Sequence, residues 1–165
     1  MKKIGLDEAQ TNNLIKEIID ITKFFKKQPN VDCIYFSTYD KLGSIDGDIL
    51  NITIVSTNDK EDNIYKTISD KNHMYCNKKV IEEYGMKIFI EVDLAQEYQD
   101  IDDLLSYESR SVYLANSAIL FDRTGEYTSL RDKTKQILKA ETKNRRFENA
   151  ERVFPNLEKV IKKQI

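Results

Sequence analysis

The chain has 165 residues, of which 40% are hydrophobic and 33% are charged, and it carries a formal net charge of −2. This size and composition predict one soluble globular domain with its own core, which needs no disulfide or structural metal. The slightly negative net charge argues against a general nucleic-acid binder, because such proteins are usually strongly basic. No apolar run approaches the length of a membrane helix and no secretory leader pattern is present, so we expect no membrane association. Two cysteines make no disulfide framework, which favours the reducing cytoplasm.

Residues 7–27 are expected to form an amphipathic helix that packs behind the first strand. Asp7 is a suitable N-terminal cap, and Pro29 prevents the helix from continuing. The apolar stripe recurs at helical spacing, with Thr22 filling one of its positions. It consists of Leu14, Ile15, Ile18, Ile19 and Phe25.

Two apolar runs, residues 31–37 and 49–55, predict neighbouring strands joined by a polar connection. The connection ends in Asp46-Gly47-Asp48, directly before the second run. Side chains two residues apart on an extended chain point the same way, so the two carboxylates form an aligned pair. Such oxygen ligands suit Mg²⁺, which usually shares them with a substrate phosphate. The alternative interpretation is a plain surface turn, in which Asp-x-Asp pairs are common.

The middle of the chain predicts two helical stretches, residues 62–75 and 76–84, followed by a third strand over residues 86–94. Alternation along this strand places Glu91 and Asp93 on one face, opposite a row of aliphatic residues. Each acidic residue is either a functional carboxylate or a solvated residue on an exposed face.

The last third predicts a helix over residues 101–113, a fourth strand over 118–121 and a helix over 128–142. The buried side of the helix over 101–113 is expected to include Leu104, Leu105, Ser106, Val112 and Tyr113. From residue 129 onward the chain holds eleven Lys or Arg and five Asp or Glu, which gives this end a charge of +6. This asymmetry indicates contact with the acidic helix, self-association or a partner site.

The order of these motifs resembles the nucleotidyltransferase superfamily that includes DNA polymerase beta and kanamycin nucleotidyltransferase. Ser37 closes the first strand, eight residues separate it from Asp46, and an apolar strand follows Asp48. Residues 118–126 and the helix after them resemble the segment that closes the small bacterial members of the superfamily. The glycine that precedes the serine in the family is replaced by Phe36.

The resemblance implies an α+β nucleotidyltransferase-like fold. Its mixed central sheet would have about four strands with flanking helices. Residues 1–142 would form this domain, and residues 143–165 would form a C-terminal helical extension.

The resemblance also implies transfer of a nucleotidyl group from a nucleoside triphosphate, with ATP the expected one, to an acceptor hydroxyl. Asp46 and Asp48 would hold Mg²⁺, and Ser37 and Thr38 would bind the phosphates. Glu91 or Asp93 would supply the third carboxylate, with a slight preference for Asp93.

Two alternatives to this function stay open, and the oligomeric state is a separate question. Phe36 in the glycine position is compatible with a catalytically degenerate module that acts as a regulatory or antitoxin-like partner of a helical protein. A homodimer is a further possibility. The simplest alternative is an α/β domain in which Asp46-Gly47-Asp48 is only a turn.

Overall fold

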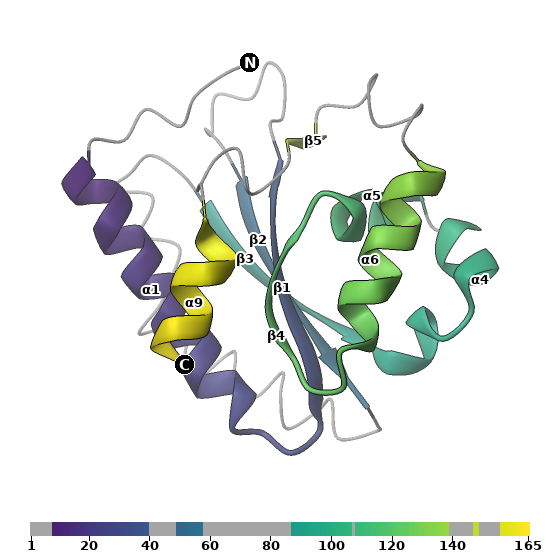
Figure 1. The fold of residues 1–165 in the computed structure, drawn as a ribbon, viewed down its shortest axis with the longest axis horizontal. Helices are drawn as coiled ribbons and strands as arrows, with labels where there is room; N and C mark the ends of the chain where they lie inside the picture. Colours follow the sequence, from purple (N-terminus) through teal and green to yellow (C-terminus); the bar gives the residue numbers. More distant parts are fainter. Residues whose placement is uncertain (1–7, 40–48, 58–86, 107, 139–146, 149–155) are drawn as a thin grey trace.

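The computed structural model describes residues 8–39, 49–57, 87–106, 108–138, 147–148 and 156–165, and it has an α+β fold built on a mixed sheet (Figure 1). The strands are β1 (Val31–Tyr39), β2 (Ile49–Ser56), β3 (Lys87–Leu94), β4 (Ala118–Asp122) and β5 (Phe147–Glu148). The helices are α1 (Glu8–Lys26), the 3-10 helix η1 (Ala95–Tyr98), α4 (Ile101–Ser106), α5 (Glu108–Ala115), α6 (Glu126–Ile137) and α9 (Leu157–Gln164).

The four main strands lie in the order β3-β2-β1-β4. Strand β1 pairs antiparallel with β2 and β4, whereas β2 and β3 are parallel. The short β5 pairs with the end of β1 through Thr38 and Tyr39. A parallel pair needs a long crossover between its strands, and residues 57–86 provide the length for it.

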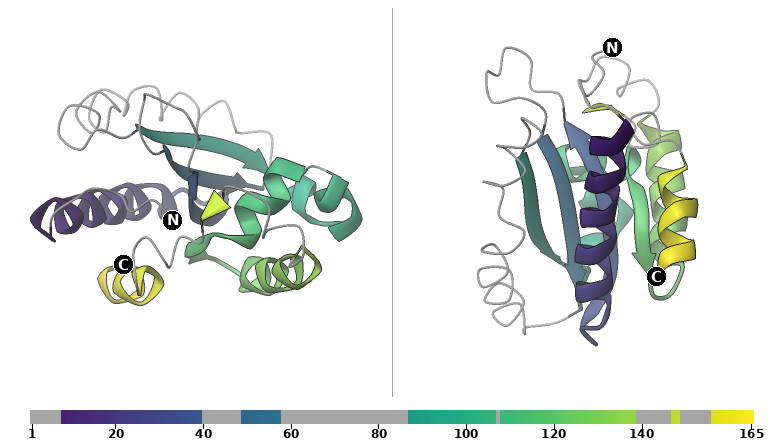
Figure 2. Two further views of the ribbon diagram at one scale, coloured as in Figure 1. Left: turned by 90° about the horizontal axis from the view of Figure 1, so that it is seen from above. Right: turned by 90° about the vertical axis from the view of Figure 1, so that its left-hand side faces the viewer.

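Helices α1 and α9 cover one face of the sheet (Figures 1 and 2). Their apolar residues pack against Val31 and against even-numbered residues of β1 and β2 in the largest hydrophobic cluster of the described residues. The buried Thr22 fits into α1 because its hydroxyl donates to the Ile18 carbonyl at 2.8 Å. The fully buried members of the cluster from α1, β1 and β2 are Leu14, Ile18, Ile21, Phe25, Val31, Ile34, Phe36, Ile52 and Ile54.

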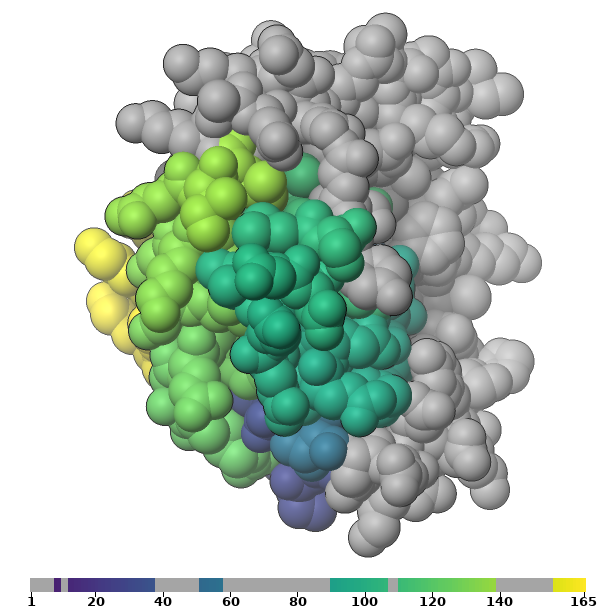
Figure 3. Space-filling view, turned by 90° about the vertical axis from the view of Figure 1, so that its right-hand side faces the viewer, coloured from purple at the N-terminus to yellow at the C-terminus, as the bar shows by residue number. Residues whose placement is uncertain are grey.

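The opposite face carries η1, α4, α5 and α6. A second cluster there joins Cys33 and Tyr35 of β1 to Tyr98, Leu114 and Tyr127. Figure 3 views the molecule from this side, with η1 and α4 in teal beside α6 in light green. The sheet therefore has a helical layer on each face. Among the described residues, no helix combines the length and apolar character that crossing a bilayer requires.

The structure confirms the predicted helix near the N-terminus and the four predicted strands, with differences of one or two residues at most of their ends. The helix expected over residues 101–113 is instead two short helices, α4 and α5. Ser106 is exposed rather than buried, since it ends α4 and its hydroxyl donates to the Asp103 carbonyl. The helices expected over residues 62–75 and 76–84 lie outside the described residues.

Helix α6 begins at Glu126, two residues earlier than predicted. The Asp122 carboxylate accepts hydrogen bonds from the Gly125 and Thr128 backbone N–H groups, at 3.0 and 2.8 Å, and so caps the first turn. Gly125 enters the helix with φ = 81°, a conformation that favours glycine. Short-range capping therefore fixes this boundary.

The C-terminal helix α9 packs on the sheet. Ile161 is fully buried and Leu157 almost so, and both belong to the main hydrophobic cluster, which also contains residues of α1. The Glu158 carboxylate accepts a hydrogen bond from the Ile119 N–H of β4 at 2.7 Å and pairs with Arg131 of α6. The basic C-terminal end is thus tied to the rest of the fold by both apolar and charged contacts.

Candidate functional site

Ser37 and Thr38 lie where β1 runs alongside the start of β2. Ser37 pairs with Asn51, and Thr38 pairs with Leu50, one residue after the first residue of β2. The Ser37 side chain is 0% exposed, and its hydroxyl has no hydrogen-bond partner among the described residues. A buried hydroxyl without a partner is costly in a folded protein and calls for an explanation such as a ligand or ordered water.

The two predicted metal ligands, Asp46 and Asp48, lie outside the described residues. In the sequence they directly precede Ile49, the first residue of β2. The described ranges contain no group of three or more His, Cys, Asp or Glu side chains positioned to share a metal ion.

Phe36 occupies the position of the family's glycine, and its side chain is fully buried among the aliphatic residues of α1, β2 and α9. Successive residues of a strand face opposite sides of the sheet. The ring therefore lies on the other side of the sheet from Ser37, and it does not fill the space beside the serine hydroxyl.

In the register of β3 on β2, the backbones of Glu91 and Asp93 lie away from the residue at which β2 begins. Glu91 pairs with Thr53, and Asp93 pairs with Val55. These partners lie four and six residues beyond Ile49, which corresponds to roughly 13 and 20 Å along the strand. Of the two candidates for the third carboxylate, Glu91 is therefore nearer to the start of β2.

Asp93 belongs to a hydrogen-bonded network that joins β1, β3, η1 and α5. The Tyr98 hydroxyl donates to Asp93, and the Tyr35 and Tyr98 hydroxyls lie 2.7 Å apart. Arg110 of α5 approaches Asp93, with Nε 3.4 Å from Oδ2, and also pairs with Glu97. The carboxylate of Asp93 is thus already occupied by a phenol and a guanidinium.

Burial governs the ionisation of this network. Removal from water holds the pKa of the Tyr35 and Tyr98 phenols well above the usual value of about 10, and the neighbouring Asp93 carboxylate acts in the same direction. The Arg110 pKa is raised by Asp93 and Glu97, although partial burial opposes them. The phenols are therefore neutral hydrogen-bond donors at physiological pH.

Glu91 is in a different position, because its side chain is exposed. Its Oε2 accepts a hydrogen bond from Asn51 Nδ2 at 3.3 Å, and the same amide nitrogen lies 3.2 Å from the Thr53 hydroxyl. Asn51 in turn pairs with Ser37 across the strands. Ser37, Asn51 and Glu91 thus form a polar band across three strands, with Glu91 open to solvent.

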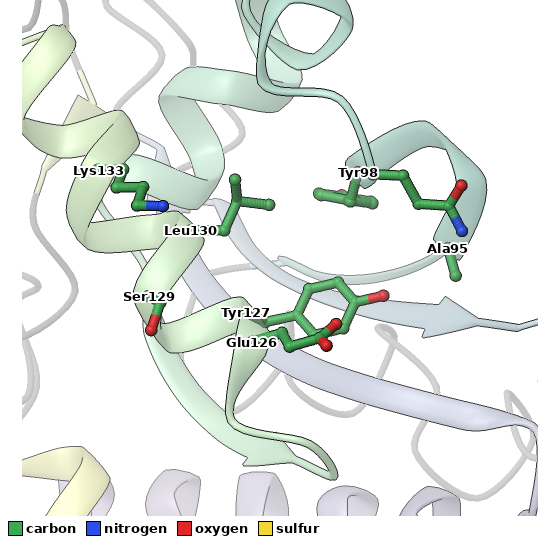
Figure 4. Close-up of a pocket in the computed structure, with 8 residues that line it drawn as sticks. Ala95, Tyr98, Glu126, Tyr127, Ser129, Leu130 and Lys133 are labelled. Carbon is green, nitrogen blue, oxygen red and sulfur yellow. The ribbon is translucent and has the colours of Figure 1, made fainter.

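The sequence interpretation missed a pocket of about 370 Å³ between η1 and α6 (Figure 4). Its walls include the Tyr98 and Tyr127 rings, which meet edge to face with centroids 5.8 Å apart. The only signal in the sequence is the spacing of Glu126, Leu130 and Lys133, which places these residues on one face of a helix. Nothing in the sequence indicates that η1 faces them.

Comparisons of the chain with protein-family models and with curated protein sequences find no match.

Proposed function

We propose that the protein binds a nucleoside triphosphate, with ATP the first candidate, together with Mg²⁺ where β1 ends and β2 begins. The observation that carries this proposal is the register of β1 on β2. It sets the buried Ser37 hydroxyl, which has no partner among the described residues, opposite Asn51, two residues beyond Ile49. Asp46-Gly47-Asp48 directly precedes Ile49 in the sequence, and in this proposal its carboxylates act beside Ser37.

In this proposal the strands present ligands to the phosphates, as in a nucleotidyltransferase-like fold. The Ser37 hydroxyl donates a hydrogen bond to a phosphate oxygen, and Asp46 and Asp48 hold Mg²⁺. The Thr38 backbone is paired with β2 on one side and β5 on the other, so it takes no part. The metal neutralises charge on the triphosphate. The acceptor hydroxyl oxygen bonds to the α-phosphorus while the bond to pyrophosphate breaks. Glu91, which is exposed and whose carboxylate reaches back along β2 to Asn51, takes up the hydroxyl proton.

In this proposal Asp93 stabilises the fold and neither binds the metal nor accepts the proton. It lies beside Val55, and its carboxylate already binds Tyr98 and Arg110. Releasing it for a metal would leave the buried Tyr98 hydroxyl without that partner, at a cost of about 1–3 kcal/mol. Glu91 is therefore preferred as the proton acceptor.

The test is calorimetric titration with ATP and Mg²⁺, followed by an assay of pyrophosphate release. We expect micromolar binding that requires the metal, equivalent to about −8 kcal/mol. The double substitution Asp46→Asn and Asp48→Asn should abolish both signals. Asp103→Asn, which removes one exposed carboxylate of α4, is the matched control and should change neither. Unchanged binding in the double variant contradicts the proposal.

A second candidate is a module that keeps the fold but does not transfer nucleotides. Two observations favour it: Phe36 fills the position of the motif glycine as a core residue, and Asp93 is committed to a network. A folded protein that neither binds ATP with Mg²⁺ nor releases pyrophosphate would support this candidate. Co-expression with the product of an adjacent gene would then test for a helical partner protein.

A further inference from the structure

The Glu91 side chain extends back toward the start of β2. Glu91 pairs with Thr53 in the register of β3 on β2, but its Oε2 accepts the hydrogen bond from Asn51, which lies two residues earlier in β2. Two residues of a strand span roughly 7 Å. Because Asn51 pairs with Ser37, this contact directs the exposed Glu91 carboxylate toward the buried serine.

The Asn51 amide is held by two partners. Asn51 is only 3% exposed, and its Nδ2 lies 3.3 Å from Glu91 Oε2 and 3.2 Å from the Thr53 hydroxyl oxygen. A carboxylate only accepts hydrogen bonds, so the amide presents its N–H and not its carbonyl to Glu91. The second N–H of the same nitrogen then donates to Thr53, whose hydroxyl oxygen is the acceptor.

A buried chain of hydroxyls continues from Thr53 to Asp93. Tyr35 pairs with Thr53 across β1 and β2, and the two side chains share a hydrogen bond. The Tyr35 and Tyr98 hydroxyls lie 2.7 Å apart, and Tyr98 donates to Asp93. Each hydroxyl has a single proton to donate. Because the Tyr98 proton goes to Asp93, Tyr35 donates to Tyr98, and the Tyr35 oxygen is left to accept the proton of Thr53.

The direction of every bond in this chain follows from Asp93. Its carboxylate accepts from Tyr98 and is also approached by Arg110, with Nε 3.4 Å from Oδ2. Thr53 and Tyr35 are each only 1% exposed, so their hydroxyls have few alternative partners. A Thr53 hydroxyl that donates its proton inward offers only its oxygen to Asn51, and this fixes which way the amide is turned.

We propose that Asn51 is a positioning residue that directs the Glu91 carboxylate toward Ser37. The hydroxyl chain anchored at Asp93 sets the orientation of the Asn51 amide. The inference rests on the proposed nucleotidyl transfer only for the role of Glu91 as proton acceptor. The two carboxylates of β3 thus have separate roles, since Asp93 anchors the chain and Glu91 is placed by its far end.

A double-mutant cycle tests whether Asn51 acts through Glu91. Pyrophosphate release is measured for the wild type, Asn51→Ala, Glu91→Gln and the double variant. We expect Asn51→Ala to lower kcat roughly tenfold and to leave the KM for ATP unchanged, because a displaced proton acceptor slows the chemical step and not binding. In the Glu91→Gln background, the same substitution should lower kcat no further.

Asn116→Ala is the matched control. It removes another asparagine amide, which donates to the Val112 carbonyl at the end of α5, and it should leave kcat unchanged. If Asn51→Ala lowers kcat by the same factor with and without Glu91, its effect is structural and the inference is overturned. An equal fall in kcat for Asn116→Ala also overturns it.

Nuclear magnetic resonance of the ¹⁵N-labelled full chain tests the contacts independently of activity. The Asn51 side-chain amide signal is the one that disappears in Asn51→Ala. We expect it to shift in Glu91→Gln, which removes the charge of its acceptor, and in Tyr35→Phe, which interrupts the hydroxyl chain. Asp103→Asn, at an exposed position on α4, should not shift it.

The two measurements separate this inference from the proposed function. A wild-type protein that releases no pyrophosphate, but whose Asn51 signal shifts in both variants, rejects nucleotidyl transfer and supports the placement of Glu91 by Asn51. An Asn51 signal that is unchanged in Glu91→Gln or in Tyr35→Phe overturns the inference, whatever the activity of the wild type.

Discussion

The two faces of the central sheet are made by alternating residues of the same strands, yet they carry different side chains. Toward α1 and α9, β1 and β2 present Ile34, Phe36, Ile52 and Ile54. Toward η1 and α6, the same strands present Tyr35, Ser37, Asn51 and Thr53. The first face forms the main apolar cluster, whereas the second combines aromatic packing with hydrogen bonds.

The two faces stabilise the fold in different ways. Apolar side chains contribute through the area that they remove from water, and they need no exact partner. Buried polar groups are stable only when they are hydrogen-bonded. The second face meets that requirement through the bonds of Tyr35, Tyr98 and Asn51, and it leaves Ser37 unpartnered among the described residues. The proposed triphosphate site uses Ser37 of this second face.

The largest expected loss of stability comes from truncating a side chain in the apolar face. Ile52→Ala should lower the free energy of unfolding by about 2–5 kcal/mol, because it removes a fully buried side chain from the main cluster and leaves a cavity. Urea denaturation measures the change. Val160→Ala, at an exposed position on α9, should change the stability by less than about 0.5 kcal/mol. Equal losses for both variants would show that this face is not the main source of stability.

An intermediate loss of stability is expected at alkaline pH, and it arises from the buried phenols of the second face. The folded-state pKa values of Tyr35 and Tyr98 are raised by burial, so these phenols stay protonated in the fold while the unfolded chain ionises near pH 10. Their contribution to stability is complete below pH 10 and is lost as the pH rises. Each phenol should remove about 1.4 kcal/mol per pH unit above 10.

Denaturation at several pH values, with absorbance at 295 nm to follow ionisation, checks this expectation. Tyr35 and Tyr98 should ionise together with unfolding rather than before it. Tyr35→Phe removes one phenol from the network and should make the alkaline loss of stability less steep. Free ionisation of all nine tyrosines in the folded protein would contradict the buried network.

The smallest effect is expected at the solvent edge of the second face. Glu91→Gln should change the free energy of unfolding by less than about 0.5 kcal/mol, because the side chain is exposed and accepts a single hydrogen bond from Asn51. The same variant should slow pyrophosphate release while leaving ATP binding intact. A fall in stability with no change in that rate would assign Glu91 a structural role.

The sequence predicted the fold well wherever local patterns were strong. The apolar stripe of α1 and the runs of β1 and β2 were placed correctly, because a period of 3.6 or 2 follows from burying one face of a helix or strand. The prediction of one helix over residues 101–113 was wrong. Helical periodicity there did not reveal the break between α4 and α5.

The candidate site was only partly predictable. Alternation correctly placed Glu91 on the face opposite Ile90 and Val92, which pack against the main apolar cluster. It said nothing about how far along the sheet Glu91 lies from Ile49, because that distance depends on the register of β3 against β2. It also did not distinguish Asp93 from Glu91. The distinction arises from Tyr98 and Arg110, which reach Asp93 from η1 and α5.

The sequence by itself determined the strands, the first helix and the alternation of side chains, since each depends on residues that are close together in the chain. The tertiary structure alone decided which carboxylate is bound internally and which is open to solvent, and it alone formed the pocket between η1 and α6. These features depend on contacts between residues such as Tyr98 and Tyr127, which are distant in sequence and meet only when the helices pack on the sheet. Local sequence patterns carry no information about such long-range contacts.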